Sequence, residues 1–190
     1  METPDQCAFA REEDAVAALC GALAPHFNLF REIEVAVDGR LCRIDCIACD
    51  PTTKWVLGFE VKRGFFQPAE YATALKQAAD YRAAVIVDPA LPLLKGKRLA
   101  ATLIFPNWIA GAAPRKAGRY TEMARGMELL AAKFKVGTAE ITLAHGLFLT
   151  MAQGRLWSTS MGWGHNAENV LFGKRQIAAQ RDYEAGLARG

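Results

Sequence analysis

Two acidic residues and a lysine stand in neighbouring apolar segments of the first third of the chain. Asp45 lies in RLCRIDCIAC, residues 40–49, and fifteen residues later Glu60 and Lys62 occur in WVLGFEVK, residues 55–62. Carboxylates are hard oxygen ligands that suit Mg²⁺ or Mn²⁺. A bound divalent ion activates water and offsets the charge that builds up on a phosphate, and a neighbouring lysine can orient that water. The three residue types therefore suit metal-dependent hydrolysis of a phosphate ester.

Both segments have the composition of β-strands, in which side chains alternate between two faces. Glu60 and Lys62 should therefore share a face, and the turn-rich residues 50–54 predict an antiparallel hairpin that brings Asp45 to within about 5 Å of Glu60. An ionised side chain in an apolar strand costs several kcal/mol unless it is paired or bound to a metal, which favours a functional role over an ordinary solvated one. The alternation predicts two faces for residues 40–48, with Arg43, Asp45 and Ile47 on one and Cys42, Ile44 and Cys46 on the other.

The order R-I-D, then E-V-K, then Q-A-A-D-Y resembles the PD-(D/E)xK nuclease superfamily, and in particular its RecB-like branch, in which a Q-x-x-x-Y element follows E-x-K. The resemblance covers roughly residues 9–110, and Ile44 stands where the superfamily's name has proline. It implies a restriction-endonuclease-like fold and a site for Mg²⁺ or Mn²⁺. The implied roles are metal ligation by Asp45, Glu60 and the carbonyl of Val61, catalysis by Lys62, and lining of the site and contact with the DNA backbone by Gln77 and Tyr81.

A glutamate of the first helix often completes the metal site in this superfamily. Apolar residues recur at helical spacing between residues 9 and 24, and both Glu12 and Glu13 lie in the first turns. Glu13 is favoured because it lies on the same helical stripe as Phe9 and Cys20. Glu12 shares a side of the helix with Val16 and Leu19, so the choice between the two stays open. The alternative role of both is to stabilise the helix dipole.

The remaining patterns predict one α/β domain with a mixed central sheet flanked by helices in the order αβββαβ. The expected elements are a strand at 30–37, a tight turn at Asp38-Gly39, a helix at 68–82, a buried strand at 83–87 reached from that helix by a crossover, and a strand at 101–105. Residues 1–110 form the expected nuclease-like core. Residues 111–190 form an extension of the same domain, with a helix at 120–136, strands at 139–144, 147–151 and 155–157, and a polar loop at 158–169.

The chain has 23 Lys and Arg residues against 20 Asp and Glu, a net charge of +3 that permits a polyanionic partner without requiring one. Apolar runs of about 20 residues are missing and the first residues are polar, which predicts a cytoplasmic protein without a membrane segment. The residues expected to contact DNA phosphates are Arg63, Lys95, Lys97, Arg98, Arg115, Lys116, Lys174 and Arg175.

Cys42, Cys46 and Cys49 have the spacing C-x3-C-x2-C, which iron–sulfur enzymes of the radical-SAM type use. A strand would direct Cys42 and Cys46 away from Cys49, whereas cluster ligands need a loop that wraps the metal. We therefore expect reduced thiols and no iron–sulfur cluster.

The sequence thus favours a Mg²⁺- or Mn²⁺-dependent deoxyribonuclease that acts in DNA repair, in recombination or in the processing of mobile-element or phage DNA. The alternative is a DNA-binding or assembly protein that has a nuclease-like fold and does not cleave. The choice between endonuclease and exonuclease stays open, as does the choice between a monomer and a homodimer.

Overall fold

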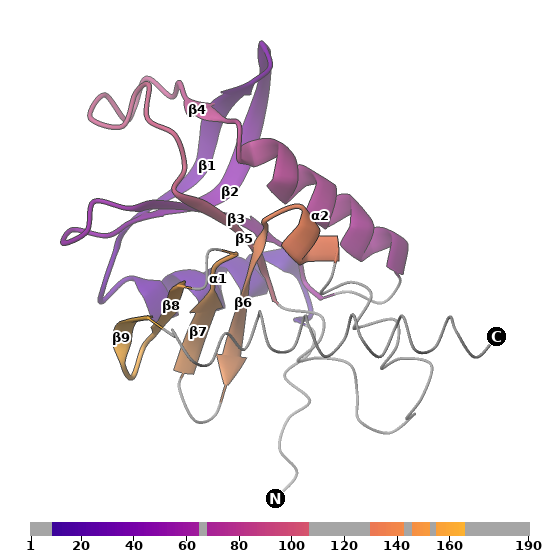
Figure 1. Ribbon diagram of the computed structural model, residues 1–190, viewed down its shortest axis with the longest axis vertical. Helices are drawn as coiled ribbons and strands as arrows, with labels where there is room; N and C mark the ends of the chain where they lie inside the picture. Colours follow the sequence, from indigo (N-terminus) through magenta and orange to yellow (C-terminus); the bar gives the residue numbers. More distant parts are fainter. Residues whose placement is uncertain (1–8, 65–67, 107–129, 143–145, 153–154, 166–190) are drawn as a thin grey trace, which may run out of the picture.

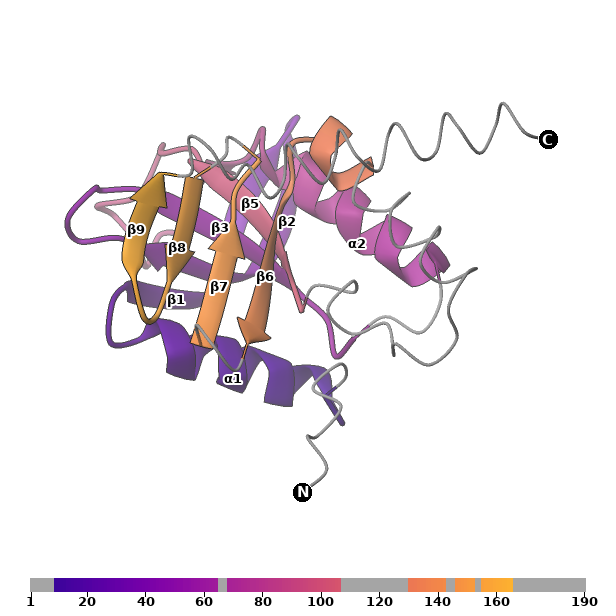
Figure 2. The ribbon, with the colours of Figure 1, turned by 60° about the horizontal axis from the view of Figure 1, so that its bottom comes forward.

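The computed structural model describes residues 9–64, 68–106, 130–142, 146–152 and 155–165. In these residues a single mixed sheet has the strand order β4-β1-β2-β3-β5-β6-β7-β8-β9, and helices α1 and α2 cover its opposite faces (Figures 1 and 2). The prediction of a mixed α/β architecture flanked by helices is confirmed. The bounds are α1 Glu12–Leu23, β1 Asn28–Val37, β2 Arg40–Cys49, β3 Val56–Val61, α2 Pro68–Tyr81, β4 Val85–Ile86, β5 Ala101–Phe105, β6 Gly137–Thr142, β7 Gly146–Thr150, β8 Arg155–Ser158 and β9 Gly162–His165.

Helix α1 packs an apolar stripe on one face of the sheet. Its buried residues are Ala15, Val16, Leu19 and Leu23, which join a cluster with the β3 and β5 side chains of that face. The helix begins at Glu12 rather than at Phe9 because Asp14 caps it: the Asp14 carboxylate accepts a hydrogen bond from the Arg11 backbone N–H at 3.2 Å. Glutamates 12 and 13 therefore lie in the first turn, at the end of the helix that faces the C-terminal end of β3.

Strands β1 and β2 form the predicted hairpin. The turn residues Asp38 and Gly39 have φ angles of 48° and 78°, the left-handed conformation that a two-residue hairpin turn requires. In β2 and β3, Cys46 pairs with Phe59 and Cys49 with Val56 in an antiparallel register. This register places Asp45 opposite Glu60.

The predicted alternation of side chains along β2 is wrong at its middle. Ile44 and Ile47 lie three residues apart but pack in the same cluster, whereas Cys46 packs on the other face against α1. The same slip occurs on β1, where Phe30 and Ile33 join the cluster of Ile44 and Ile47. Side chains alternate between the two faces only along a regular strand. In both β1 and β2 the alternation shifts by one residue beside Asp45.

The residue opposite Asp45 on β1 accounts for this slip. The pairs Arg31–Cys46 and Ile33–Ile44 flank it, so the partner of Asp45 is Glu32, and Glu32 has a φ of 55°. A left-handed conformation is uncommon for a residue with a side chain, and such strained positions occur preferentially at functional sites. Because of this distortion, the side chains on either side of Asp45 in β2 do not follow the regular alternation between the two faces.

The connection after α2 differs from the predicted crossover. Residues 83–87 contribute only the short strand β4, which pairs antiparallel with β1 at one edge of the sheet. The parallel partner of β3 is β5, whose bounds match the predicted strand at 101–105. Two apolar segments follow the helix, and local composition does not say which of them pairs with β3. The Val87 backbone N–H donates to the Glu34 carbonyl, which holds the first segment at the β1 edge.

The C-terminal strands continue the same sheet, because β6 pairs parallel with β5 and β7, β8 and β9 follow as antiparallel neighbours. Strand β9 lies in the segment predicted to be a loop. Its Trp163 packs against Trp55 and Phe27 and donates a hydrogen bond to Asp50, contacts that a glycine-rich polar pattern does not reveal. Most of the helix predicted at 120–136 lies outside the described residues. In the described part of the chain, neither helix nor any other helical turn has the length and apolar character to cross a membrane.

Candidate active site

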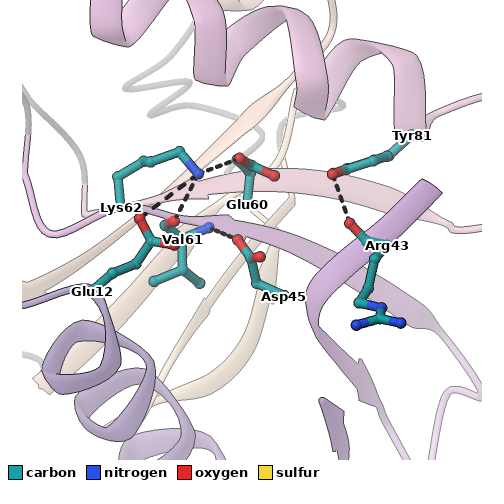
Figure 3. Close-up of polar contacts among 7 residues, drawn as sticks. All are labelled: Glu12, Arg43, Asp45, Glu60, Val61, Lys62 and Tyr81. Carbon is teal, nitrogen blue, oxygen red and sulfur yellow. Dashed lines mark hydrogen bonds and ion pairs between the residues drawn. The ribbon is translucent and has the colours of Figure 1, made fainter. Parts of the chain in front are cut away.

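Asp45 and Glu60 meet at the C-terminal end of β3, where regular pairing with β2 stops. The last pair of the β2–β3 ladder is Cys46 with Phe59. The residue before Cys46 on β2 is Asp45, and its carboxylate accepts a hydrogen bond from the Val61 backbone N–H at 2.7 Å (Figure 3). A side-chain acceptor thus takes the place of a backbone carbonyl, and it fixes the Asp45 carboxylate beside the backbone that links Glu60 to Lys62.

The ammonium of Lys62 lies among three oxygen atoms. Its Nζ is 2.5 Å from Glu60 Oε1, 3.1 Å from the carbonyl oxygen of Val61 and 3.9 Å from Glu12 Oε2. Figure 3 shows the four residues converging from β3 and from the start of α1. The backbone N–H of Lys62 donates to the Phe105 carbonyl at 2.8 Å, so β5 holds the base of this side chain. The arrangement presents anionic and carbonyl oxygens to a single cationic group.

Glu12, not Glu13, is the helix glutamate at the site. Both glutamates are exposed, but the Glu12 carboxylate lies 3.9 Å from the Lys62 ammonium, whereas the charge of Glu13 acts on Arg11. The sequence-based preference for Glu13 is therefore corrected. Neighbouring residues on a helix point about 100° apart, and the packing of α1 on the sheet decides which of them faces the end of β3.

Burial makes the two carboxylates reluctant to ionise together. The Glu60 side chain is only 2% exposed, and its pKa is raised by burial and by the negative charge of Asp45, with partial opposition from Lys62 and Tyr81. Burial also raises the pKa of Asp45, against the Val61 hydrogen bond and the charge of Lys62. Burial disfavours the charge on Lys62, but the hydrogen bond and charge of Glu60, with the charges of Asp45 and Glu12, outweigh it and raise the pKa of the ammonium. One ammonium thus faces the buried carboxylate of Glu60 and the half-buried carboxylate of Asp45, and ionisation of both would leave the site with unbalanced negative charge.

The donor set fits a hard divalent ion that retains water. Glu60 Oε2 is buried and accepts no hydrogen bond from the described residues. Two carboxylates and a backbone carbonyl form a typical partial shell for Mg²⁺, which keeps several water ligands. Within the ranges that the structure describes, His, Cys, Asp and Glu side chains form no group of three that could hold a metal by themselves. The Val61 carbonyl and water would therefore have to complete the shell.

Tyr81 and Gln77 lie on α2 above the same face. The Tyr81 hydroxyl donates to the Arg43 carbonyl at 2.9 Å, and its pKa is raised by burial and by the charges of Glu60 and Asp45, so the phenol remains protonated. Tyr81 thereby anchors β2 two residues before Asp45. Gln77 is half-buried, and none of the hydrogen bonds among the described residues joins it to the carboxylates.

The residues expected to bind DNA fall into three groups. Arg63 is exposed directly after Lys62. Lys95, Lys97 and Arg98 are also exposed, but they precede β5, whose Ala101 pairs with Leu57, so they lie beyond the opposite end of β3. From Leu57 to Val61 the strand alone spans about 13 Å, so these three side chains lie away from the carboxylates, and their contact with DNA phosphates stays a prediction. Arg115, Lys116, Lys174 and Arg175 lie outside the described residues.

Sequence reasoning missed the contribution of Glu32. Its charge raises the pKa of Asp45, and the register places it opposite Asp45 on β1. Arg43 balances part of this charge, with its guanidinium 3.8 Å from Glu32 Oε2. The signal in the sequence is the register itself: counting back from the Asp38-Gly39 turn pairs residue 32 with residue 45.

Replacing Glu12 by Gln should weaken Mn²⁺ binding by about 10-fold, because the amide keeps the shape of the side chain and removes one negative charge near the cation position. Glu13→Gln is the matched control and should bind Mn²⁺ as the wild type does. Calorimetric titration of both variants makes the comparison. Equal weakening in the two variants would show a long-range charge effect rather than a role for Glu12 at the site.

We compared the chain with protein-family models, with curated proteins and with solved structures, and none of the three comparisons finds a match.

Proposed function

We propose that the protein is a Mg²⁺- or Mn²⁺-dependent deoxyribonuclease with the PD-(D/E)xK arrangement. One observation carries the proposal: Asp45, Glu60, the Val61 carbonyl and Lys62 converge at the end of β3, where one ammonium faces the buried carboxylate of Glu60 and the half-buried carboxylate of Asp45. Two neighbouring carboxylates, one of them buried, rarely persist for a structural reason alone, because their like charges repel each other away from water. A pair that a divalent ion can bridge has a functional reason to persist.

Each residue of the site has a role in this proposal. Asp45 and Glu60 hold the ion, together with the Val61 carbonyl that already faces a cation. A bound divalent ion supplies an activated water and offsets negative charge on the phosphate. The Lys62 side chain is 27% exposed, so its ammonium can swing from Glu60 towards solvent, where it orients the attacking water and faces the phosphate oxygens. Tyr81 keeps β2 in register, and Glu12 adds negative charge on the α1 side.

Polyanionic DNA suits an exposed basic side chain at this end of the sheet. Arg63 directly follows the catalytic lysine and is exposed, and the chain as a whole has a pI of about 8.6. Contacts between cationic side chains and phosphates release counterions, so binding should weaken as salt rises. We assign the superfamily's core to residues 1–110 and treat the later strands as an extension of the same sheet.

Incubation with linear, circular, single-stranded and branched DNA tests the proposal and separates endonuclease from exonuclease action. The wild type should cleave in Mg²⁺ or Mn²⁺ and stop when the metal is chelated. Asp45→Asn should reduce cleavage about 10³-fold, because the amide still accepts the Val61 hydrogen bond but ligates a cation poorly.

Asp38→Asn is the matched control for this change. Asp38 lies at the hairpin turn with a φ of 48°, a conformation that asparagine tolerates, so this variant should retain wild-type activity. Binding of DNA without cleavage on any of the four substrates, in either metal, would favour the non-cleaving DNA-binding or assembly protein instead.

A further inference from the structure

Two thiols face each other between α1 and β2, one residue along the strand from Asp45. The Sγ atoms of Cys20 and Cys46 are 3.9 Å apart, within the range of a sulfur hydrogen bond, and both cysteines are free. Cys46 is fully buried beneath the helix, whereas Cys20 is half-buried and therefore open to small molecules. The two other described cysteines, Cys42 and Cys49, pack on the opposite face of the sheet.

The surroundings of Cys20 favour its thiolate. Arg31 pairs with Cys46 across β1 and β2, which places a guanidinium-bearing side chain beside the two sulfur atoms. The hydrogen bond with Cys46 lowers the pKa of Cys20 to about 7, against the effect of burial, and the charge of Arg31 acts in the same direction as the hydrogen bond. Reactive cysteines typically combine partial exposure with such an electropositive environment. By contrast, burial raises the pKa of Cys49.

We propose that Cys20 and Cys46 form a reversible redox pair, in which a hydroperoxide oxidises Cys20 and Cys46 then closes a disulfide that links α1 to β2. The inference does not depend on the proposed nuclease activity. It concerns the contact between the middle of α1 and β2, whereas the candidate active site lies at the C-terminal end of β3.

The chemistry balances with hydrogen peroxide as the oxidant. The Cys20 thiolate attacks one oxygen atom, the O–O bond breaks, and the departing hydroxide takes up a proton to give water and a sulfenic acid on Cys20. The Cys46 sulfur then attacks the Cys20 sulfur, the S–O bond breaks, and hydroxide leaves as water with the proton of Cys46. Two thiols and one peroxide thus give one disulfide and two waters, and an external dithiol reverses the process by exchange.

The fold permits this closure at small cost. A disulfide has an S–S distance of about 2.05 Å, so the sulfur atoms must approach by about 1.9 Å. Strand β2 is held by hydrogen bonds to β1 and β3 on both sides, whereas α1 rests on the sheet through side-chain packing. A small shift of the helix or a rotation of the Cys20 side chain therefore supplies the movement.

Peroxide treatment followed by mass spectrometry tests the proposal directly. The full chain has five cysteines, and the oxidised wild type should lose two hydrogens in mass and retain three titratable thiols. Trypsin should then yield a disulfide that joins peptide 12–31, which holds Cys20, to peptide 44–54. Because the second peptide holds both Cys46 and Cys49, the digestion is repeated on Cys49→Ser, which should retain the same cross-link.

Two further variants separate the roles of the sulfur atoms. Cys20→Ser should remain reduced under the same treatment, and Cys46→Ala should accumulate a Cys20 sulfenic acid that dimedone traps. A cross-link that is lost in Cys49→Ser, a disulfide that involves Cys7 or Cys42, or a wild type that keeps five thiols under peroxide would overturn the proposal. Each of these results is independent of metal binding and of DNA cleavage.

Discussion

Glu60→Gln should abolish metal-dependent DNA cleavage and at the same time raise the stability of the metal-free protein. The Glu60 side chain is 2% exposed, and its Oε2 atom accepts no hydrogen bond from the described residues. The negative charge of Asp45 also acts on this carboxylate. Glutamine retains the shape of the side chain and removes the buried charge. We expect cleavage to fall at least about 10³-fold, since the ion loses its most buried ligand.

The gain in stability follows from the pKa of Glu60. Burial and Asp45 raise it above its ordinary value of 4.5, so the folded protein holds this proton more tightly than the unfolded chain does. The free energy of unfolding of the wild type should therefore fall as the pH rises from about 4.5 through the raised pKa. Glutamine does not titrate, so the variant avoids this loss, and it should be more stable than the wild type at neutral pH because Lys62 keeps Asp45 and Glu12 as anionic neighbours.

Thermal unfolding with and without Mn²⁺ checks both effects in one experiment. An ion that binds only the folded state at 100 times its dissociation constant adds about 2.7 kcal/mol, so Mn²⁺ should raise the Tm of the wild type and of the control Glu13→Gln. It should leave the Tm of Glu60→Gln unchanged. A Glu60→Gln protein that is both metal-stabilised and active would contradict the assigned role.

Lys62→Met should also lose about 10³-fold in cleavage, but with the opposite effects on metal affinity and stability. The Lys62 ammonium occupies the position that a cation would take between Glu60 and the Val61 carbonyl, so its removal should leave Mn²⁺ affinity equal or higher. It also leaves the buried Glu60 without its partner, which should destabilise the metal-free protein by about 2–4 kcal/mol. Mn²⁺ should restore most of that loss.

Lys76→Met is the matched control for this prediction. Lys76 is an exposed lysine on α2 that pairs with Asp80 at 2.8 Å, and such pairs contribute about 0.3–0.5 kcal/mol. It should keep both activity and stability, and calorimetric titration with Mn²⁺ compares all three proteins. If Lys62→Met cleaves at the wild-type rate, the water-orienting role of this lysine is wrong even when Glu60 proves to be a ligand.

The types and local order of the candidate site residues follow from the sequence. Strand composition, the Asp38-Gly39 turn and the turn-rich residues 50–54 suffice to predict the hairpins, because the periodicity and turn chemistry are properties of short segments. The register that sets Asp45 opposite Glu60 follows from the same local signals, and the strand at 101–105 agrees residue for residue with β5.

Long-range packing alone decided the rest. The choice of Glu12 over Glu13 depends on how α1 rotates on the sheet, and the place of β4 at the edge depends on which strand offers free backbone groups. The slip in alternation at Asp45 depends on the conformation of Glu32 in another strand, and the 3.9 Å approach of Cys20 to Cys46 on the docking of a helix. A pattern of residue types describes one element and its own faces. The contacts that build this site arise where elements meet, and only the folded chain brings those surfaces together.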